Sequence, residues 1–89
     1  MYKLEFTPTA KIHAEKLSAA PKLFKKLEKL LEEIILHPKT GTGKPEQLKH
    51  YETPTWSRRI SDKHRLVYQI HENIVTVLVV AAFGHYEDK

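Results

Sequence analysis

The sequence predicts an α+β fold in which two N-terminal helices pack on one face of a twisted, mostly antiparallel four-stranded sheet. Three observations predict it: an alternating apolar segment at the start, two segments with helical apolar spacing after it, and three strand-like segments in the second half. The expected order is strand, helix, helix, strand, strand, strand, and such grouping is typical of a layered α+β domain. With 89 residues, the chain is expected to form a single domain over 1–89.

The first half of the chain should supply one strand and both helices. Residues 2–6 alternate between apolar and polar side chains, which indicates a strand with one face on the core. A break at Thr7 starts a short helix that runs to about Ala19. A second helix should run from Pro21 to about Leu36, because a wide apolar stripe recurs there on a 3.6-residue period.

The second half should hold a long loop and three strands. Residues 38–55 contain two of the three glycines and three of the five prolines, and a loop of this length is usually functional or disordered. Strands are predicted at 56–61 and 64–70, joined as a hairpin, and at 74–83. The last of them is a nearly continuous apolar run, which is typical of a strand buried on both faces.

Composition limits the classes of function. Residues 37–70 hold seven lysines and arginines and three acidic residues, so this segment carries the whole formal net charge of +4 and suits an anionic partner such as nucleic acid. The chain has no cysteine, which excludes disulfides and thiolate chemistry, and its histidines lack metal-ligand spacing. We therefore expect no metal and no cofactor. The sequence shows neither a membrane-length apolar run nor a signal-peptide core, which predicts a cytoplasmic protein with no membrane partner.

One arginine is expected in the middle of the sheet. Alternation along 64–70 places Tyr68 among the side chains that face the helices and Arg65 on the face that the helices leave open. An arginine there can direct two hydrogen bonds onto a phosphate. The alternative is that Arg65 pairs with a loop carboxylate such as Glu52 or Asp62.

Two other segments carry groups suited to acid–base chemistry. Glu46 lies in the long loop between Lys44 and Lys49, and a carboxylate among cations stays ionised and can accept a proton. His85 and Tyr86 follow the last predicted strand, and histidine is a natural general acid near neutral pH. The alternatives are an ordinary solvated glutamate and a partly exposed chain end.

Together, Glu46, Arg65 and His85 would supply the three roles that metal-free RNA cleavage requires. A base takes the proton of the 2′-hydroxyl, a cation stabilises the charge that grows on the phosphorane, and an acid protonates the departing 5′-oxygen. DNA has no 2′-hydroxyl, so these groups would be inert on it.

The motifs GTGKPEQLKH and WSRRISDKHRLVY, with the closing HY, resemble the YoeB/Txe toxins of bacterial toxin–antitoxin modules in the RelE/ParE superfamily. The motif match covers residues 37–86, and the helical half matches in pattern alone. The resemblance implies a RelE-like fold and a ribosome-dependent endoribonuclease that cuts mRNA in the ribosomal A site. It also implies a YefM-like antitoxin as partner and a homodimer as one expected assembly.

The resemblance also assigns roles to residues. Glu46 falls on the general base, Arg65 on the phosphate-stabilising arginine, His85 on the general acid and Tyr86 on the tyrosine beside it. Basic positions that hold RNA or orient the site in the family fall on Lys44, Lys49 and Arg59. Arg58 has the opposite strand parity from Arg59 and is expected to cap the edge of the domain.

Some features depart from the family, and rival functions follow from its fold. Residues 51–55 lack the glycine that often precedes the Trp-Ser-Arg-Arg motif, and 82–84 stand where some members carry a cysteine–arginine pair. A ParE-like toxin, which inhibits DNA gyrase without cutting RNA, is one alternative. A module kept for binding an antitoxin is another. Neither would need Glu46, Arg65 and His85 in these places.

Overall fold

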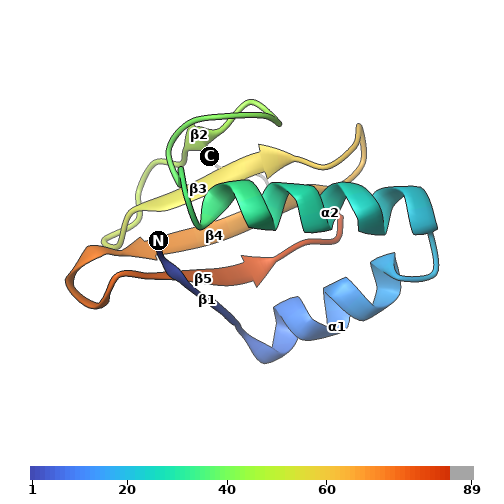
Figure 1. Cartoon of the computed structure of the whole chain (residues 1–89), viewed down its shortest axis with the longest axis horizontal. Helices are drawn as coiled ribbons and strands as arrows, with labels where there is room; N and C mark the ends of the chain where they lie inside the picture. The colour runs from blue at the N-terminus through green and yellow to red at the C-terminus, as the bar shows by residue number, and fades with distance from the viewer. Residues whose placement is uncertain (85–89) are drawn as a thin grey trace.

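A computed structural model describes residues 1–84, in which two helices and five strands form two layers (Figure 1). The elements are β1 (Lys3–Phe6), α1 (Pro8–Leu17), α2 (Pro21–Ile34), β2 (Glu46–Gln47), β3 (Thr55–Arg59), β4 (Arg65–His71), a 3₁₀ turn η1 (Glu72–Ile74) and β5 (Thr76–Ala81). The strand order is β1-β5-β4-β3-β2, with β1 parallel to β5 and the other neighbours antiparallel. The predicted α+β class and the mostly antiparallel sheet are confirmed.

The fifth strand, β2, corrects the predicted four-stranded sheet. Glu46 pairs with Ser57 and Gln47 pairs with Trp56, so the long loop adds a short edge strand beside β3. Two residues are too few to show an alternating pattern, so this strand could not be predicted from the sequence. The last strand is also shorter than the predicted strand over 74–83: β5 spans Thr76–Ala81, because residue 74 ends the 3₁₀ turn and Val75 has left-handed backbone angles.

Prolines and a cap set the starts of both helices. The Thr7 side chain accepts a hydrogen bond from the backbone N–H of Ala10 at 3.1 Å, and Pro8 occupies the first turn of α1. Pro21 likewise opens α2. The two helices run in opposite directions across the sheet (Figure 1).

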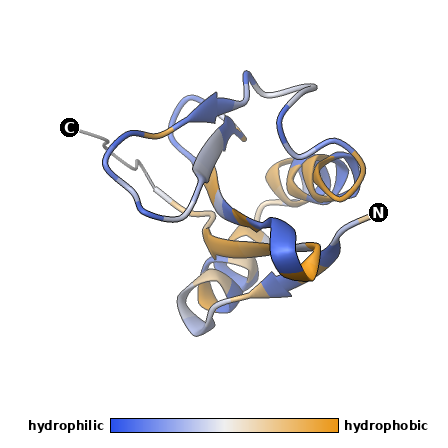
Figure 2. Cartoon of the chain, turned by 90° about the vertical axis from the view of Figure 1, so that its left-hand side faces the viewer, coloured by the Kyte–Doolittle hydropathy of each residue, from blue (hydrophilic) through white to orange (hydrophobic). Residues whose placement is uncertain are grey.

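The core lies between the helices and one face of the sheet. Its fully buried apolar residues are Ala10, Leu17, Leu27, Leu30, Ile34, Ile60, Leu66, Tyr68, Ile70, Val77, Val79 and Ala82. Leu66, Tyr68 and Ile70 belong to this cluster, so the predicted assignment of the faces of β4 is confirmed. Hydrophilic colours are concentrated at the edge of the sheet formed by β2, β3 and their loops (Figure 2). This edge borders the open face of the sheet, which is the face without helices.

Candidate active site on the open sheet face

The open face of the sheet brings together residues that are far apart in sequence. Glu46 on β2 lies opposite Ser57 on β3, and Ser57 lies opposite Val67 on β4. In the next row, Arg59 lies opposite Arg65. Directly opposed residues of antiparallel strands project from the same face. Glu46, Arg59 and Arg65 therefore share the face that carries no helix.

Strand spacing sets the scale of this site. Glu46 and Arg65 are two strands and two residues apart, which separates their Cα atoms by roughly 12 Å at standard sheet spacings. Within residues 1–84, no ion pair joins them. A carboxylate and a guanidinium held apart in this way can act on different atoms of one bound ligand without neutralising each other.

The side chain of Arg65 is half-buried, whereas those of Glu46, Arg59, Lys44 and Lys49 are exposed. In the described part of the chain, the ion pair present is Arg58–Glu33, and neither Glu52 nor Asp62 pairs with Arg65. The alternative in which Arg65 is used in a structural ion pair with a loop carboxylate is therefore wrong.

The last described residue, Gly84, is held beside Arg65 by two hydrogen bonds. The backbone N–H of Arg65 donates to the carbonyl of Gly84 at 3.2 Å, and the N–H of Gly84 donates to Nδ1 of His64 at 2.8 Å. The described chain thus ends at the first residue of β4, next to the arginines. His85 and Tyr86, predicted as acid and neighbouring tyrosine, lie outside the described residues.

Arg58 does not cap the edge of the domain, so that prediction is wrong. Its side chain is 0% exposed and lies on the helix-covered face, in line with Trp56 and Tyr68. The guanidinium donates to the Tyr68 hydroxyl at 3.1 Å and to the Glu33 carboxylate at 2.6 Å. It also donates to the backbone carbonyls of Thr42 at 3.2 Å, His37 at 2.6 Å and Thr40 at 2.7 Å. A buried charge is tolerated here because each of its donors has an acceptor.

The groups around Arg58 complete a network that holds the loop after α2. Hydrogen bonds from the side chain and the N–H of Thr42 lower the pKa of Glu33, and Arg58 lowers it further. Burial raises the pKa of Tyr68, and its hydroxyl donates to the Pro38 carbonyl at 2.7 Å. The network fixes residues 37–42, and this loop leads directly to the strand that carries Glu46.

Gly43 joins this network to the open face. Its carbonyl accepts the N–H of Arg59 at 2.7 Å, and its φ of +81° lies in the left-handed region. A Cβ at Gly43 would lie 3.0 Å from the Arg59 carbonyl oxygen and 3.2 Å from the Arg58 Cβ. Only a residue without a side chain fits here without strain.

We expect Gly43→Ala to lower the free energy of unfolding by about 2 kcal/mol, since left-handed strain costs about 1–2 kcal/mol and a backbone contact is compressed as well. Urea denaturation measures this change. Gly84→Ala is the matched control, because its φ of +86° imposes the same strain while a Cβ there would meet nothing within 4 Å. Equal losses in the two variants would show that the close approach at Gly43 has no cost.

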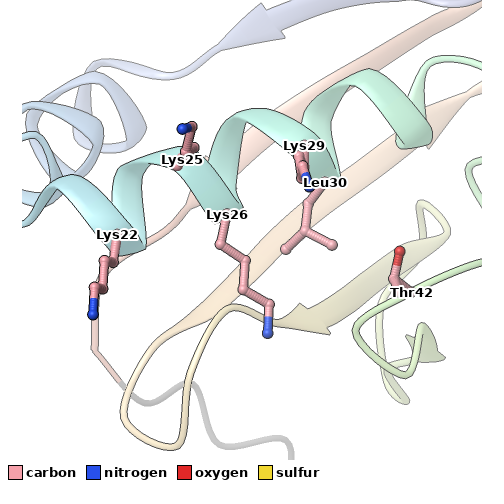
Figure 3. Close-up of a pocket in the computed structure, with 6 residues that line it drawn as sticks. All are labelled: Lys22, Lys25, Lys26, Lys29, Leu30 and Thr42. Atoms are coloured by element: carbon pink, nitrogen blue, oxygen red, sulfur yellow. The ribbon is translucent and has the colours of Figure 1, made fainter.

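A second basic surface lies away from this site. A hollow of about 350 Å³ between α2 and the loop at Thr42 is lined by four lysines of one helix face and by Leu30 (Figure 3). The lysines are Lys22, Lys25, Lys26 and Lys29. The lining has no carboxylate or imidazole, which are the groups best suited to acid–base catalysis near neutral pH. This surface adds to the positive potential of the molecule.

Other kinds of site receive no support from the described residues. Among 1–84, no group of three or more histidine and acidic side chains is placed to hold a metal ion. Over the same range, no helix is long and apolar enough to cross a membrane.

The fold is that of the RelE-like class of toxins, as solved structures show. A YoeB dimer from Staphylococcus aureus superposes with a TM-score of 0.83 and 32% identity, over 96% of this chain and 98% of that one. A YoeB–YefM complex from the same species superposes with a TM-score of 0.80 and 33% identity, over 97% of this chain and 99% of the toxin chain.

Sequence comparison gives the family. Residues 15–86 match the model of the YoeB-like toxin of bacterial type II toxin–antitoxin systems. The toxin YoeB of Escherichia coli K12 is 40% identical over 65 residues, which is 73% of this chain and 75% of that protein. The chain belongs to the YoeB-like toxin family, and the predicted resemblance is confirmed.

Proposed function

We propose that this chain is a ribosome-dependent endoribonuclease, a toxin that cleaves mRNA in the ribosomal A site and so stops translation. One observation supports this proposal above the others: Glu46, Arg59 and Arg65 share one open sheet face in a chain of the YoeB-like toxin family. A carboxylate on the same face as two guanidiniums suits a reaction on a phosphodiester. A surface that only binds protein would not need this combination of groups.

The proposed reaction uses the 2′-hydroxyl of the mRNA as nucleophile. Glu46 takes the proton of this hydroxyl while its oxygen attacks the adjacent phosphorus. Arg65 stabilises the extra negative charge on the phosphoryl oxygens of the phosphorane. His85, with Tyr86 beside it, gives a proton to the 5′-oxygen as the phosphorus–oxygen bond breaks, which leaves a 2′,3′-cyclic phosphate. The balance requires no metal, oxidant or cofactor.

The remaining basic residues of the prediction would bind and orient the RNA. Lys44, Lys49 and Arg59 lie on or beside β2 and β3, next to the row that carries Glu46. We propose that mRNA and ribosomal RNA phosphates contact them in the cytoplasm. Because the related S. aureus toxin is seen both in complex with YefM and as a dimer, we also propose a YefM-like antitoxin and a homodimer for this chain.

Toeprinting on programmed ribosomes tests the proposal, with wild-type protein and His85→Ala, each with and without ribosomes. We expect a cut in the A-site codon from the wild type on ribosomes, no cut of the same mRNA alone, and loss of the cut in the variant. Lys25→Ala, a loss of one positive charge on α2, is the control for a nonspecific effect of charge.

Each departure from this result has a different meaning. If the wild type makes no cut, the endoribonuclease proposal fails, and inhibition of DNA gyrase supercoiling becomes the assay for the ParE-like alternative. A cut on free mRNA would remove the ribosome from the proposal. A cut of normal rate by His85→Ala would remove His85 from the role of acid.

A further inference from the structure

Two histidines outside the predicted catalytic set bind the same short segment at the end of the described chain. Nδ1 of His64, in the β3–β4 connection, accepts the N–H of Gly84 at 2.8 Å. Nδ1 of His13, on α1, accepts the N–H of Ala82 at 3.1 Å. Alternate amides of one segment are thus held by side chains that lie 51 positions apart in the sequence.

The ring between these amides is packed against the same histidines. The Phe83 and His64 rings have centroids 4.4 Å apart with an interplanar angle of 34°, and the Phe83 and His13 rings have centroids 6.1 Å apart. The ammonium of Lys16 lies 5.3 Å from the centroid of Phe83 on the side of α1. Phe83 is 40% exposed, so these contacts place it without burying it in the core.

The direction of the hydrogen bonds fixes the state of both imidazoles. A backbone N–H can only donate, so each Nδ1 must be unprotonated, and the ring proton must sit on Nε2. Burial lowers the pKa of His13, with a smaller contribution from Lys16, which agrees with a neutral ring. An acceptor at the δ1 position, and not a charge, is therefore what the segment requires from each histidine.

The held segment ends beside Arg65. Gly84 is held through both of its backbone polar groups, because its carbonyl also accepts the N–H of Arg65 at 3.2 Å. Its φ of +86° gives the chain a sharp change of direction at this point. The next residue in the sequence is His85, the proposed acid.

We infer that His64 and His13 are positioning residues, which fasten residues 82–84 so that the acid that follows is delivered to the arginine end of the open face. This inference rests on the proposed function for its catalytic part, whereas the fastening itself does not depend on it. Effective acid catalysis needs the donor placed to within about 1 Å, and misplacement of that size can cost about 100-fold in rate. His64 should matter more than His13, because its bond is to the residue adjacent to His85.

Two substitutions at His64 distinguish the contribution of its hydrogen-bond acceptor from that of its aromatic ring. In His64→Asn, the amide oxygen occupies the δ1 position and can still accept from Gly84, while His64→Leu has similar volume and no acceptor. The full chain is labelled with ¹⁵N, and hydrogen exchange of the Gly84 and Ala82 amides is measured by NMR. Single-turnover cleavage on programmed ribosomes is measured in parallel, at saturating toxin and at half-saturation.

We expect His64→Leu to raise the exchange rate of the Gly84 amide at least about tenfold and to lower the saturated cleavage rate about 10- to 100-fold. The half-saturating concentration should stay unchanged, because no RNA contact is removed. His64→Asn should restore most of both. His13→Leu and His13→Asn form a second pair, with the effect on exchange seen at Ala82, and they keep the test decisive if His64→Leu does not fold.

Three results would overturn the inference. An unprotected Gly84 amide in the wild type would show that the segment is not fastened. Wild-type cleavage by His64→Leu with an exposed Gly84 amide would show that fastening does not position the acid. Loss of cleavage in both His64 variants, with Gly84 protected in His64→Asn, would make the imidazole itself a catalytic group. If the wild type cuts no RNA, the proposed function fails. The hydrogen-exchange data would then still show whether His64 and His13 hold residues 82–84.

Discussion

Replacing Arg58 with methionine is expected to lower the free energy of unfolding by at least about 3 kcal/mol. The substitution keeps much of the apolar stem but leaves the Tyr68 hydroxyl, the Glu33 carboxylate and three loop carbonyls without their donor. Breaking a buried ion pair from one side costs about 3–5 kcal/mol, and the 32% exposure of the Glu33 side chain places the loss near the lower end.

Urea denaturation of Arg58→Met and Arg59→Met, compared at one temperature, measures this difference. Arg59 is the next residue on β3 and is exposed, so its substitution should change the free energy of unfolding by no more than about 0.5 kcal/mol. Arg58→Lys should lose most of what Arg58→Met loses, because one ammonium cannot serve five acceptors in a plane. A loss below about 1 kcal/mol in Arg58→Met would show that the network does not hold the loop.

The role of Arg58 shows where sequence reasoning reached its limit. Arg58 shares strand parity with Trp56, which agrees with the core face that the structure shows, but burial of an unpaired charge is so unfavourable that parity alone does not predict it. What makes burial tolerable is a set of backbone carbonyls from 37–42, together with Glu33. Every residue has a backbone carbonyl, so the sequence does not show which carbonyls will surround Arg58. That depends on the path of the loop.

The elements that sequence predicted correctly are those set by local periodicity. The stripe of α2 and the alternation of β4 each repeat often enough to define a buried face, and both faces are in the core. The strand β2 and the 3₁₀ turn before β5 are too short to repeat. They depend on pairing with β3 and on the turn geometry of residues 72–75, and both are consequences of tertiary structure.

For the candidate site, the alternation of β4 predicted the face of Arg65. The positions of Glu46 and Arg59 on that face follow from the strand register, which only the structure shows. The sequence could not show that Glu46 pairs with Ser57, and this pairing is what puts the carboxylate on the same face as Arg59 and Arg65. The positioning role of His64 was also not predicted, because His64 lies next to Arg65 in the WSRRISDKHRLVY motif and the arginine accounted for that motif. In the sequence His64 is only a histidine at the start of a predicted strand. Its role becomes visible when the structure places the Gly84 N–H against its ring.

Replacing Arg65 with alanine is expected to lower the rate of mRNA cleavage on programmed ribosomes by about 10²–10³-fold. On the proposed mechanism Arg65 donates to phosphoryl oxygens whose charge grows only in the transition state, and loss of one such donor has an effect of this size. The substitution should leave the core intact, because Arg65 is not part of the core cluster and lies on the opposite face of β4 from Leu66 and Tyr68. Affinity for the antitoxin and the midpoint of urea unfolding should therefore change little.

Arg59→Ala provides the matched comparison, since Arg59 lies directly opposite Arg65 in the register of β3 and β4. If Arg59 only binds RNA, its loss should raise the half-saturating toxin concentration and reduce the dependence of that concentration on salt. The saturated rate should stay near that of the wild type. Arg65→Ala should show the reverse, a lower saturated rate with a similar half-saturating concentration. If the two variants behave alike, both arginines bind phosphate in the ground state, and the stabilisation of the phosphorane must come from elsewhere on the face. Arg65→Lys then separates charge from geometry, because an ammonium keeps the charge but cannot direct two parallel hydrogen bonds onto one phosphate.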